Sequence, residues 1–213
     1  MLAATGAESF ETRAARHLRP EPPGILDALT DPNGDHALEK AGWPGGPPLR
    51  PKPAAVLVPV VMHEEEATIL FTERASHLRD HSGQIALPGG KIDRDETPRD
   101  TALREAEEEI GLDPRLVRPV GHLDSYLASS GFIVFPVVGL VSPGFTLRLN
   151  AHEVEDAFEV PLSFLMDPAN HQIHAREWKG DIRQYYAMPF GHRYIWGVTA
   201  GILRNLYVRL YES

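Results

Sequence analysis

One short helix, with strong signals at both ends, constrains this sequence more than any other feature. Thr97 can cap its first turn, Pro98 suits the first helical position, and Asp100 completes a capping box. Gly111 can end it, because glycine readily adopts the left-handed conformation found just beyond helix ends. The sequence therefore predicts a helix with defined ends between residues 97 and 111.

Three glutamates share one face of this helix. Glu105, Glu108 and Glu109 are spaced i, i+3 and i+4, whereas Glu107 points elsewhere. Neighbouring carboxylates repel one another by roughly a few tenths of a kcal/mol per pair, so a bound cation would stabilise the cluster. Hard oxygen ligands favour Mg²⁺ or Mn²⁺ over zinc. We therefore predict a magnesium or manganese site; the alternative is a solvated acidic face.

The segment before the helix adds to this prediction. Gly89 and Gly90 follow a predicted strand, and glycines there let the backbone approach a ligand, so that the Gly90 carbonyl can join a metal shell. Glu96 precedes Arg104 at a spacing that lets the two side chains pair. We expect this pair to hold the loop against the helix.

The first 53 residues differ in amino-acid composition from the rest of the chain. They are rich in proline, so we expect a short helix over 6–18 and then an irregular arm. This arm is expected to wrap the domain, or a partner subunit in a homodimer, with Trp43 as its anchor. Residues 54–213 are expected to form the compact domain.

The pattern of apolar residues in this domain predicts both strands and helices. Strands are expected over 54–62, 68–74, 117–126, 132–141, 158–162 and 185–188, and a closing helix over 195–211. The first two strands are expected to form a hairpin, and Pro59 predicts an edge strand or a bulge. Tyr185, Tyr186 and Trp196 are expected to be packing residues rather than a base-stacking platform. This order indicates an α/β domain with a mixed sheet.

Composition and charge exclude several classes of function. The chain is 42% hydrophobic with a formal net charge of −9, and its basic residues are scattered, which argues against a nucleic-acid partner. With no cysteine, it has no disulfide, thiolate nucleophile or cysteine zinc site. The apolar stretch 54–62 is far shorter than the ~20 residues of a membrane span. No basic segment of a secretory signal stands near the start. We expect a cytoplasmic protein without a membrane partner.

Residues 90–112 resemble the signature of the Nudix hydrolases. Gly90 is followed by five residues, Glu96, seven residues and then the run Arg104-Glu-Ala-Glu-Glu-Glu-Ile-Gly-Leu112. Ala106 departs from the family, which usually has a larger aliphatic residue there. The resemblance implies a Nudix-type α/β/α sandwich with a mixed β-sheet. It also implies a set of metal ligands: Glu105, Glu108, Glu109 and the Gly90 carbonyl.

A second resemblance, upstream, points to the substrate. Arg74, Arg79, Gly83 and the run Leu87-Pro-Gly-Gly90 match the spacing of the motif of the coenzyme A pyrophosphatase branch, although Leu87 replaces its usual phenylalanine. This similarity implies a small-molecule diphosphate substrate, coenzyme A or a derivative, contacted by Arg74, Arg79 and Gly89. The alternatives are ADP-ribose, a dinucleotide or, without catalysis, a ligand-binding module.

Hydrolysis of such a diphosphate needs a general base. The products from coenzyme A would be 3′,5′-ADP and 4′-phosphopantetheine. The candidate bases are Glu108 and Glu109 in the signature, and Glu153 and Glu155 in a later acidic stretch. The family uses bases in both places, so the sequence leaves the choice open.

Overall fold

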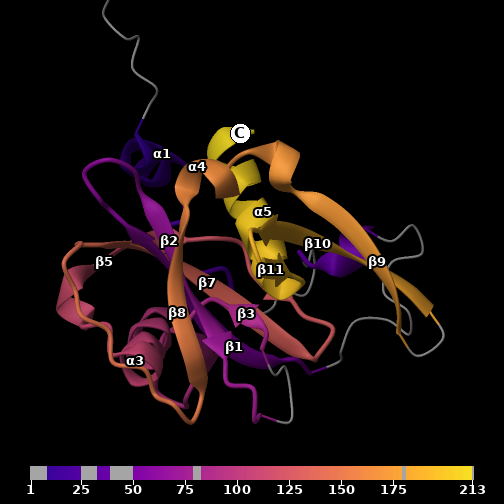
Figure 1. Ribbon diagram of the computed structural model, residues 1–213, viewed down its shortest axis with the longest axis horizontal. Helices are drawn as coiled ribbons and strands as arrows, with labels where there is room; N and C mark the ends of the chain where they lie inside the picture. Colours follow the sequence, from indigo (N-terminus) through magenta and orange to yellow (C-terminus); the bar gives the residue numbers. More distant parts are fainter. Residues whose placement is uncertain (1–8, 25–32, 39–49, 79–82, 179–180, 213) are drawn as a thin grey trace, which may run out of the picture.

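The computed structural model (Figure 1) describes residues 9–24, 33–38, 50–78, 83–178 and 181–212. Its main sheet is formed by β1 (Lys52–Val61), β2 (Thr68–Arg74), β3 (Ile85–Ala86), β4 (Gly89–Lys91), β5 (Val117–His122), β6 (Tyr126–Leu127), β7 (Phe132–Val141) and β8 (Val154–Pro161). The order is β3-β2-β1-β7-β5, with β4 beside β1, β6 beside β7 and β8 beside β2. Parallel and antiparallel pairs both occur, so the predicted mixed sheet is confirmed.

Strand β1 lies at the centre of this sheet. It runs parallel to β7 from the pair Lys52–Phe132 to the pair Val61–Val141. On its other side it pairs first with β4 and then, in the predicted hairpin, with β2. The prediction that Pro59 marks an edge strand is therefore wrong. Position 59 points to the same side of β1 as Leu57, whose N–H donates to the Pro88 carbonyl. On this side the partner of β1 changes from β4 to β2, so proline, which has no N–H, is tolerated at position 59.

Helices cover both faces of the sheet, as Figure 1 shows. Helix α3 (Pro98–Ile110) packs on one face, where it buries Ala102, Ala106 and Ile110 against alternate residues of β1 and β7. Helix α5 (Val198–Tyr211) packs on the other face through its buried leucines. Each fully buried Leu or Ile contributes about 1.5–3 kcal/mol to folding. The α/β/α sandwich is confirmed.

The described part of the N-terminal arm packs on its own domain. Helix α1 (Phe10–His17) begins after the cap residue Ser9, inside the range predicted for it. Phe10, Ala14 and Leu18 join the cluster that contains the α5 leucines. A short 3-10 helix, η1 (Asp35–Leu38), follows Asn33, whose carbonyl accepts the Leu127 N–H at 2.7 Å. The predicted anchor Trp43 lies outside the described residues.

The C-terminal third corrects several predicted boundaries. After the short helices α4 (Leu162–Leu165) and η3 (Pro168–Asn170), a second sheet is formed by β9 (Gln172–Trp178), β10 (Asp181–Phe190) and β11 (Arg193–Trp196). The strand expected over 158–162 begins earlier, at Val154, and ends at α4. The strand expected over 185–188 is only the middle of β10, and the closing helix starts three residues later than predicted, at Val198, because residues 193–196 pair with β10.

These differences have two causes: exposed side chains in the second sheet and a break in one strand of the main sheet. In β9 and β10 apolar residues do not mark a buried face, because Ile173 and Ile182 are 52% and 73% exposed. The 3-10 helix η2 (Pro114–Leu116) leads into β5. The single strand expected over 117–126 is in fact two strands, β5 and β6, with a break between them. Periodicity detects a buried face, so it misses strands that lack one.

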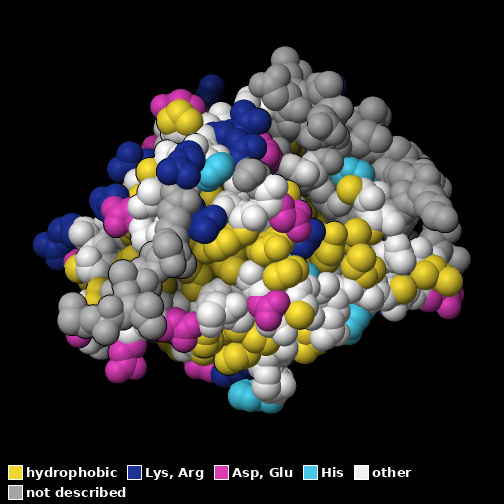
Figure 2. Space-filling view, turned by 90° about the horizontal axis from the view of Figure 1, so that it is seen from above, with side chains coloured by type: hydrophobic (Ala, Val, Ile, Leu, Met, Phe, Trp, Pro, Cys, Tyr) yellow, Lys and Arg dark blue, Asp and Glu magenta, His cyan; other side chains and the backbone are white. Residues whose placement is uncertain are grey.

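The surface agrees with the scattered charge of the sequence. Figure 2 shows basic and acidic side chains interspersed on the face it presents. None of the helices in the described part of the chain combines the length and apolar composition that a membrane span requires.

Candidate active site

Helix α3 positions the three glutamates, and its ends are set as the sequence predicts. Thr97 Oγ1 accepts the Asp100 N–H at 3.2 Å, and the Asp100 carboxylate accepts the Thr97 N–H at 3.1 Å. Gly111 adopts the left-handed conformation with φ of 68° and ends the helix. This capping box and C-terminal glycine hold the helix in one register above the sheet.

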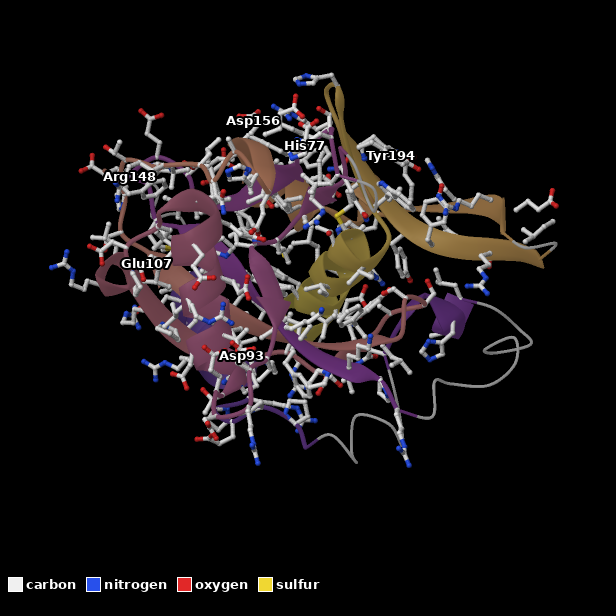
Figure 3. The ribbon with its side chains drawn as sticks, turned by 90° about the horizontal axis from the view of Figure 1, so that it is seen from below. His77, Asp93, Glu107, Arg148, Asp156 and Tyr194 are labelled. Carbon is white, nitrogen blue, oxygen red and sulfur yellow. The ribbon has the colours of Figure 1, made fainter. Side chains whose placement is uncertain are left out.

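The three glutamates differ strongly in exposure. Glu109 is buried, with 5% of its surface exposed. The side chain of Glu105 is 16% exposed and that of Glu108 is 58% exposed. Glu107, on the other side of the helix, points away from them into solvent (Figure 3). The helix face therefore runs from a buried carboxylate at Glu109 to an accessible one at Glu108.

Burial changes the acidity of the inner carboxylates. It raises the pKa of Glu109 to about 8, and the negative charges of Glu105 and Glu153 act in the same direction. Burial also raises the pKa of Glu105. In both groups burial outweighs the neighbouring positive charge, which comes from Arg104 for Glu105 and from Arg74 for Glu109.

The glycine loop lies directly against these carboxylates. Gly89 and Gly90 pair with Val56 and Ala55 of β1, and the Gly89 N–H donates to Glu109 Oε2 at 3.3 Å. A Cβ at position 90 would collide with the Glu105 carboxylate, which would have to move away from the loop. A Cβ at position 89 would collide with the Ala55 carbonyl oxygen of β1, so only glycine fits there.

The predicted pair between Glu96 and Arg104 is present. Arg104 Nε donates to Glu96 Oε1 at 2.6 Å and Nη2 to Oε2 at 3.0 Å, and Thr101 Oγ1 adds a bond of 2.6 Å. These bonds, with Arg104 first, lower the pKa of Glu96 to about 2. The sequence did not reveal Thr101 or a second role of Arg104. Arg104 Nη1 also contacts Glu105 at 2.8 Å and Glu108 at 3.0 Å.

The carboxylates of Glu105, Glu108 and Glu109 are suitable ligands for a hard divalent cation, although the three side chains point to different partners. Among the described residues, no three His, Asp or Glu side chains stand close enough together to hold a metal ion as they are. Arg104 holds Glu105 and Glu108, while Glu109 turns toward the Gly89 N–H. All donors are oxygens, as Mg²⁺ and Mn²⁺ prefer. A cation would also offset the burial of Glu105 and Glu109.

The candidate bases outside the helix are in different surroundings. The Glu155 carboxylate accepts the Ser76 N–H at 2.9 Å and so braces the loop after β2. Glu153 lies near the helix glutamates, since its charge contributes to the raised pKa values of both Glu105 and Glu109, after the larger effect of burial. Glu153 therefore acts electrostatically on the helix glutamates, whereas Glu155 is bonded to the loop after β2.

Of the two predicted substrate arginines, the structure describes one. Arg74 ends β2, and its Nε atom is buried without a hydrogen-bond partner among the described residues. Burial dominates the pKa of Glu109, and Arg74 lies close enough for its positive charge to act in the opposite direction. An unpaired buried donor needs an acceptor, so this position suits an oxyanion. Arg79 lies outside the described residues.

Sequence reasoning missed one residue beside this region. Arg193, in β11, pairs with Glu73 of β2 and Asp156 of β8, and its guanidinium lies 4.0 Å above the centre of the Phe158 ring. It thus joins the second sheet to β2, which ends at Arg74, and to β8, which begins just after Glu153. A lone arginine in a surface hairpin gives no signal of such a long-range contact.

Comparisons with known proteins agree on the family. The model of the NUDIX domain matches residues 51–179. The chain is 42% identical over 154 residues to a protein of Yersinia enterocolitica named "Uncharacterized Nudix hydrolase NudL", which covers 72% of this chain and 78% of the relative. It is 37% identical over 163 residues to a protein of the same name from Enterobacter sp., with 76% and 84% covered.

A comparison of folds gives the same family. A crystal structure of a MutT/nudix family protein from Enterococcus faecalis superposes with a TM-score of 0.52 at 17% identity, over 98% of this chain and 76% of the other. At this identity the likeness concerns the fold alone. Taken with the matched domain and the relatives, it completes the assignment: the chain belongs to the Nudix hydrolase family.

Proposed function

We propose that this Nudix hydrolase cleaves the diphosphate of coenzyme A or its acyl derivatives, giving 3′,5′-ADP and (acyl-)4′-phosphopantetheine. One observation carries the proposal: the buried carboxylate of Glu109 and the partly buried one of Glu105 face a glycine loop, and the Nε of Arg74, which has no hydrogen-bond partner among the described residues, lies near Glu109. Such a site can bind a cation and a diphosphate together. The motif that contains Arg74 resembles that of the coenzyme A branch.

Nudix hydrolases generally use divalent cations. Here Glu105, Glu108, Glu109 and the Gly90 carbonyl would hold Mg²⁺ or Mn²⁺, which when bound would acidify water and neutralise charge on the phosphates. Arg104 would release Glu105 and Glu108 and keep its bidentate pair with Glu96. The chain supports this exchange, since Arg104 is also bonded to the loop through Glu96 and through the Lys91 carbonyl at 3.4 Å.

The remaining residues act on the water and the phosphates. Water attacks one phosphorus, the bond from that phosphorus to the bridging oxygen breaks, and the leaving phosphate keeps that oxygen. Glu153 takes the proton of the attacking water, because Glu155 is bonded to Ser76 and Glu109 is buried. Arg74, and by resemblance Arg79 with the Gly89 backbone, bind the phosphate oxygens.

Replacing Glu153 and Glu155 one at a time tests this assignment. Glu153→Gln should lower kcat by about 10²- to 10⁴-fold while leaving Mn²⁺ affinity unchanged. Glu155→Gln is the matched control and should lower kcat far less, because it alters only a brace of the loop. Loss of Mn²⁺ affinity in Glu153→Gln, or an equal loss of rate in both variants, would contradict the role of Glu153.

The substrate is tested by a panel with Mg²⁺ and with Mn²⁺. The ratio kcat/KM should be highest for coenzyme A or acyl-coenzyme A, at least about tenfold above ADP-ribose and dinucleotides. Leu87, the departure from the branch motif, is 4% exposed and packs in the core. A higher kcat/KM for ADP-ribose or a dinucleotide would reject coenzyme A. Absence of any hydrolysis would favour a binding module.

A further inference from the structure

One face of the β9–β10–β11 sheet gathers aromatic and basic side chains. This aromatic face comprises His174, Arg176, Arg183, Tyr185, Tyr194 and Trp196. Tyr185 lies opposite His174 and Arg183 opposite Arg176 in the β9–β10 pair, and residues two apart along a strand share a face. The opposite face carries Met188 and Ile195, which are fully buried in the core.

The rings of the aromatic face are close together and held by hydrogen bonds. Tyr194 stacks on His174 and on Trp196, with ring centres 5.8 and 6.3 Å apart, and Tyr185 meets the edge of Trp196 at 5.3 Å. His174 Nδ1 and the Tyr194 hydroxyl are 2.6 Å apart, and the two tyrosine hydroxyls are 3.3 Å apart. Tyr194 nevertheless remains 38% exposed. Tyr186 packs on the core as predicted, whereas these rings form a preorganised surface.

Two arginines add positive charge to the same face. Arg183 and Arg176 stand directly opposite each other on neighbouring strands, where like charges repel. The Arg176 guanidinium lies 5.0 Å from the centre of the Trp196 ring. The Nε atom of Arg183 is buried and has no hydrogen-bond partner among the described residues. A bound anion would satisfy this donor.

Strand β11 connects the second sheet to strands of the candidate active site. The side chain of Arg193, on the opposite face of β11 from Tyr194, pairs with Glu73 of β2 and Asp156 of β8, and these strands contain Arg74 and follow Glu153. In Figure 3, Tyr194 lies on the same side of the molecule as His77 and Asp156. An extended molecule with its diphosphate at the glutamates would reach this face by passing over β11, the edge strand of the second sheet.

We propose that the aromatic face binds the nucleotide end of the substrate, with the rings stacking on a purine base and Arg176 and Arg183 contacting a phosphomonoester. Every base offers a planar π-surface to aromatic rings, and guanidinium groups bind phosphate oxygens in a bidentate manner. This assignment rests on the proposed hydrolysis of a nucleotide-containing diphosphate. It adds the subsite that would select substrates carrying a phosphorylated nucleoside.

Binding without metal tests the subsite separately from catalysis. Adenosine 3′,5′-bisphosphate is titrated by calorimetry into the full chain in EDTA, with ribose 5-phosphate as the probe that lacks a base. Tyr194→Leu and Arg183→Gln should each weaken bisphosphate binding by about tenfold or more, whereas Tyr194→Phe should retain it. Ribose 5-phosphate should depend on Arg183 and not on Tyr194. Arg115→Gln is the control, because Arg115 is 89% exposed and pairs with Asp113 in η2.

Steady-state kinetics with coenzyme A and Mn²⁺ connect the subsite to the reaction. Tyr194→Leu and Arg183→Gln should raise KM about tenfold with little change in kcat, since they remove binding far from the phosphorus. The proposal is overturned if the wild-type chain binds no bisphosphate in EDTA, or if both variants bind it normally. It is equally overturned if they lose binding with KM unchanged. If no diphosphate is hydrolysed, the calorimetry still decides whether this face binds a nucleotide.

Discussion

Glu109 is a residue of this site whose charged form is costly to bury in the folded protein. It is an acidic side chain almost fully removed from water, and the hydrogen bond that it accepts from the Gly89 N–H does not offset that burial. Arg74 has a buried guanidinium Nε for which the described part of the chain provides no hydrogen-bond partner. Unsatisfied polar groups of opposite charge in one place favour a ligand that carries both a cation and phosphate oxygens.

The raised pKa of Glu109 gives a pH-dependent prediction for the metal-free protein. The folded state keeps a proton on Glu109 up to a pKa of about 8, while the unfolded chain loses it near the ordinary value of 4.5. Stability from this group is therefore full below pH 4.5 and is lost as the pH rises toward 8. Glu109→Gln should remove this loss, so its Tm in EDTA should exceed that of the wild type at pH 8.

The same variant tests metal binding. Glu109→Gln should lower Mn²⁺ affinity by more than the roughly 10- to 100-fold typical of a lost outer-shell partner. Glu107→Gln is the control on the same helix, since Glu107 is exposed and points away from the site. Calorimetric titration with Mn²⁺ measures both. Unchanged affinity in Glu109→Gln would remove it from the ligand set.

At the scale of elements, α3 and the glycine loop act together. The capping box determines where α3 begins, and that start determines which glutamates face β4. The Glu96–Arg104 pair and Thr101 then attach the loop to the helix. Because the site is divided between these two segments, its geometry depends on both ends of α3.

Weakening the cap should destabilise the protein in a pH-dependent way. Thr97→Ala should lower the free energy of unfolding by about 1 kcal/mol at pH 7. Hydrogen bonds from Thr97 lower the pKa of Asp100 below its ordinary value of 3.8. The contribution of Asp100 is thus present above pH 3.8 and lost as the pH falls further.

Urea unfolding at pH 7 and pH 3 measures this effect. The difference between Thr97→Ala and the wild type should shrink at pH 3. Thr146→Ala, at an exposed position outside any helix or strand, should change stability by less than about 0.5 kcal/mol at either pH. An equal loss of stability at both pH values would contradict a role for the ionised Asp100.

At the scale of the whole molecule, the N-terminal helix and the C-terminal elements complete the domain. Helix α1 joins the same hydrophobic cluster as α5, and Arg13 Nη1 donates to the Leu210 carbonyl at 3.2 Å. The second sheet is tied to the first through Arg193. Segments from both ends of the chain therefore support the sheet on the side away from α3. A homodimer remains a prediction.

Removing the α1 anchor tests this integration. Phe10→Ala should lower the free energy of unfolding by about 3–5 kcal/mol, because Phe10 is 7% exposed in the core. Glu11→Gln removes only an exposed ion pair with Arg118 and should cost at most about 1 kcal/mol. Urea unfolding followed by circular dichroism measures both. Equal stability of the two variants would show that the arm folds independently of the domain.

The sequence by itself determined the helix between Thr97 and Gly111, the glutamate face, the Glu96–Arg104 pair and the mixed sheet with helices on both sides. These features depend on residues near one another in the chain or on the period of a buried face. Only the tertiary structure decided that Glu109 is buried while Glu108 is exposed, that Glu155 is bonded to Ser76, and that Arg193 joins the two sheets. Burial, pKa and long-range ion pairs depend on which distant segments meet, and no local pattern of residues records that.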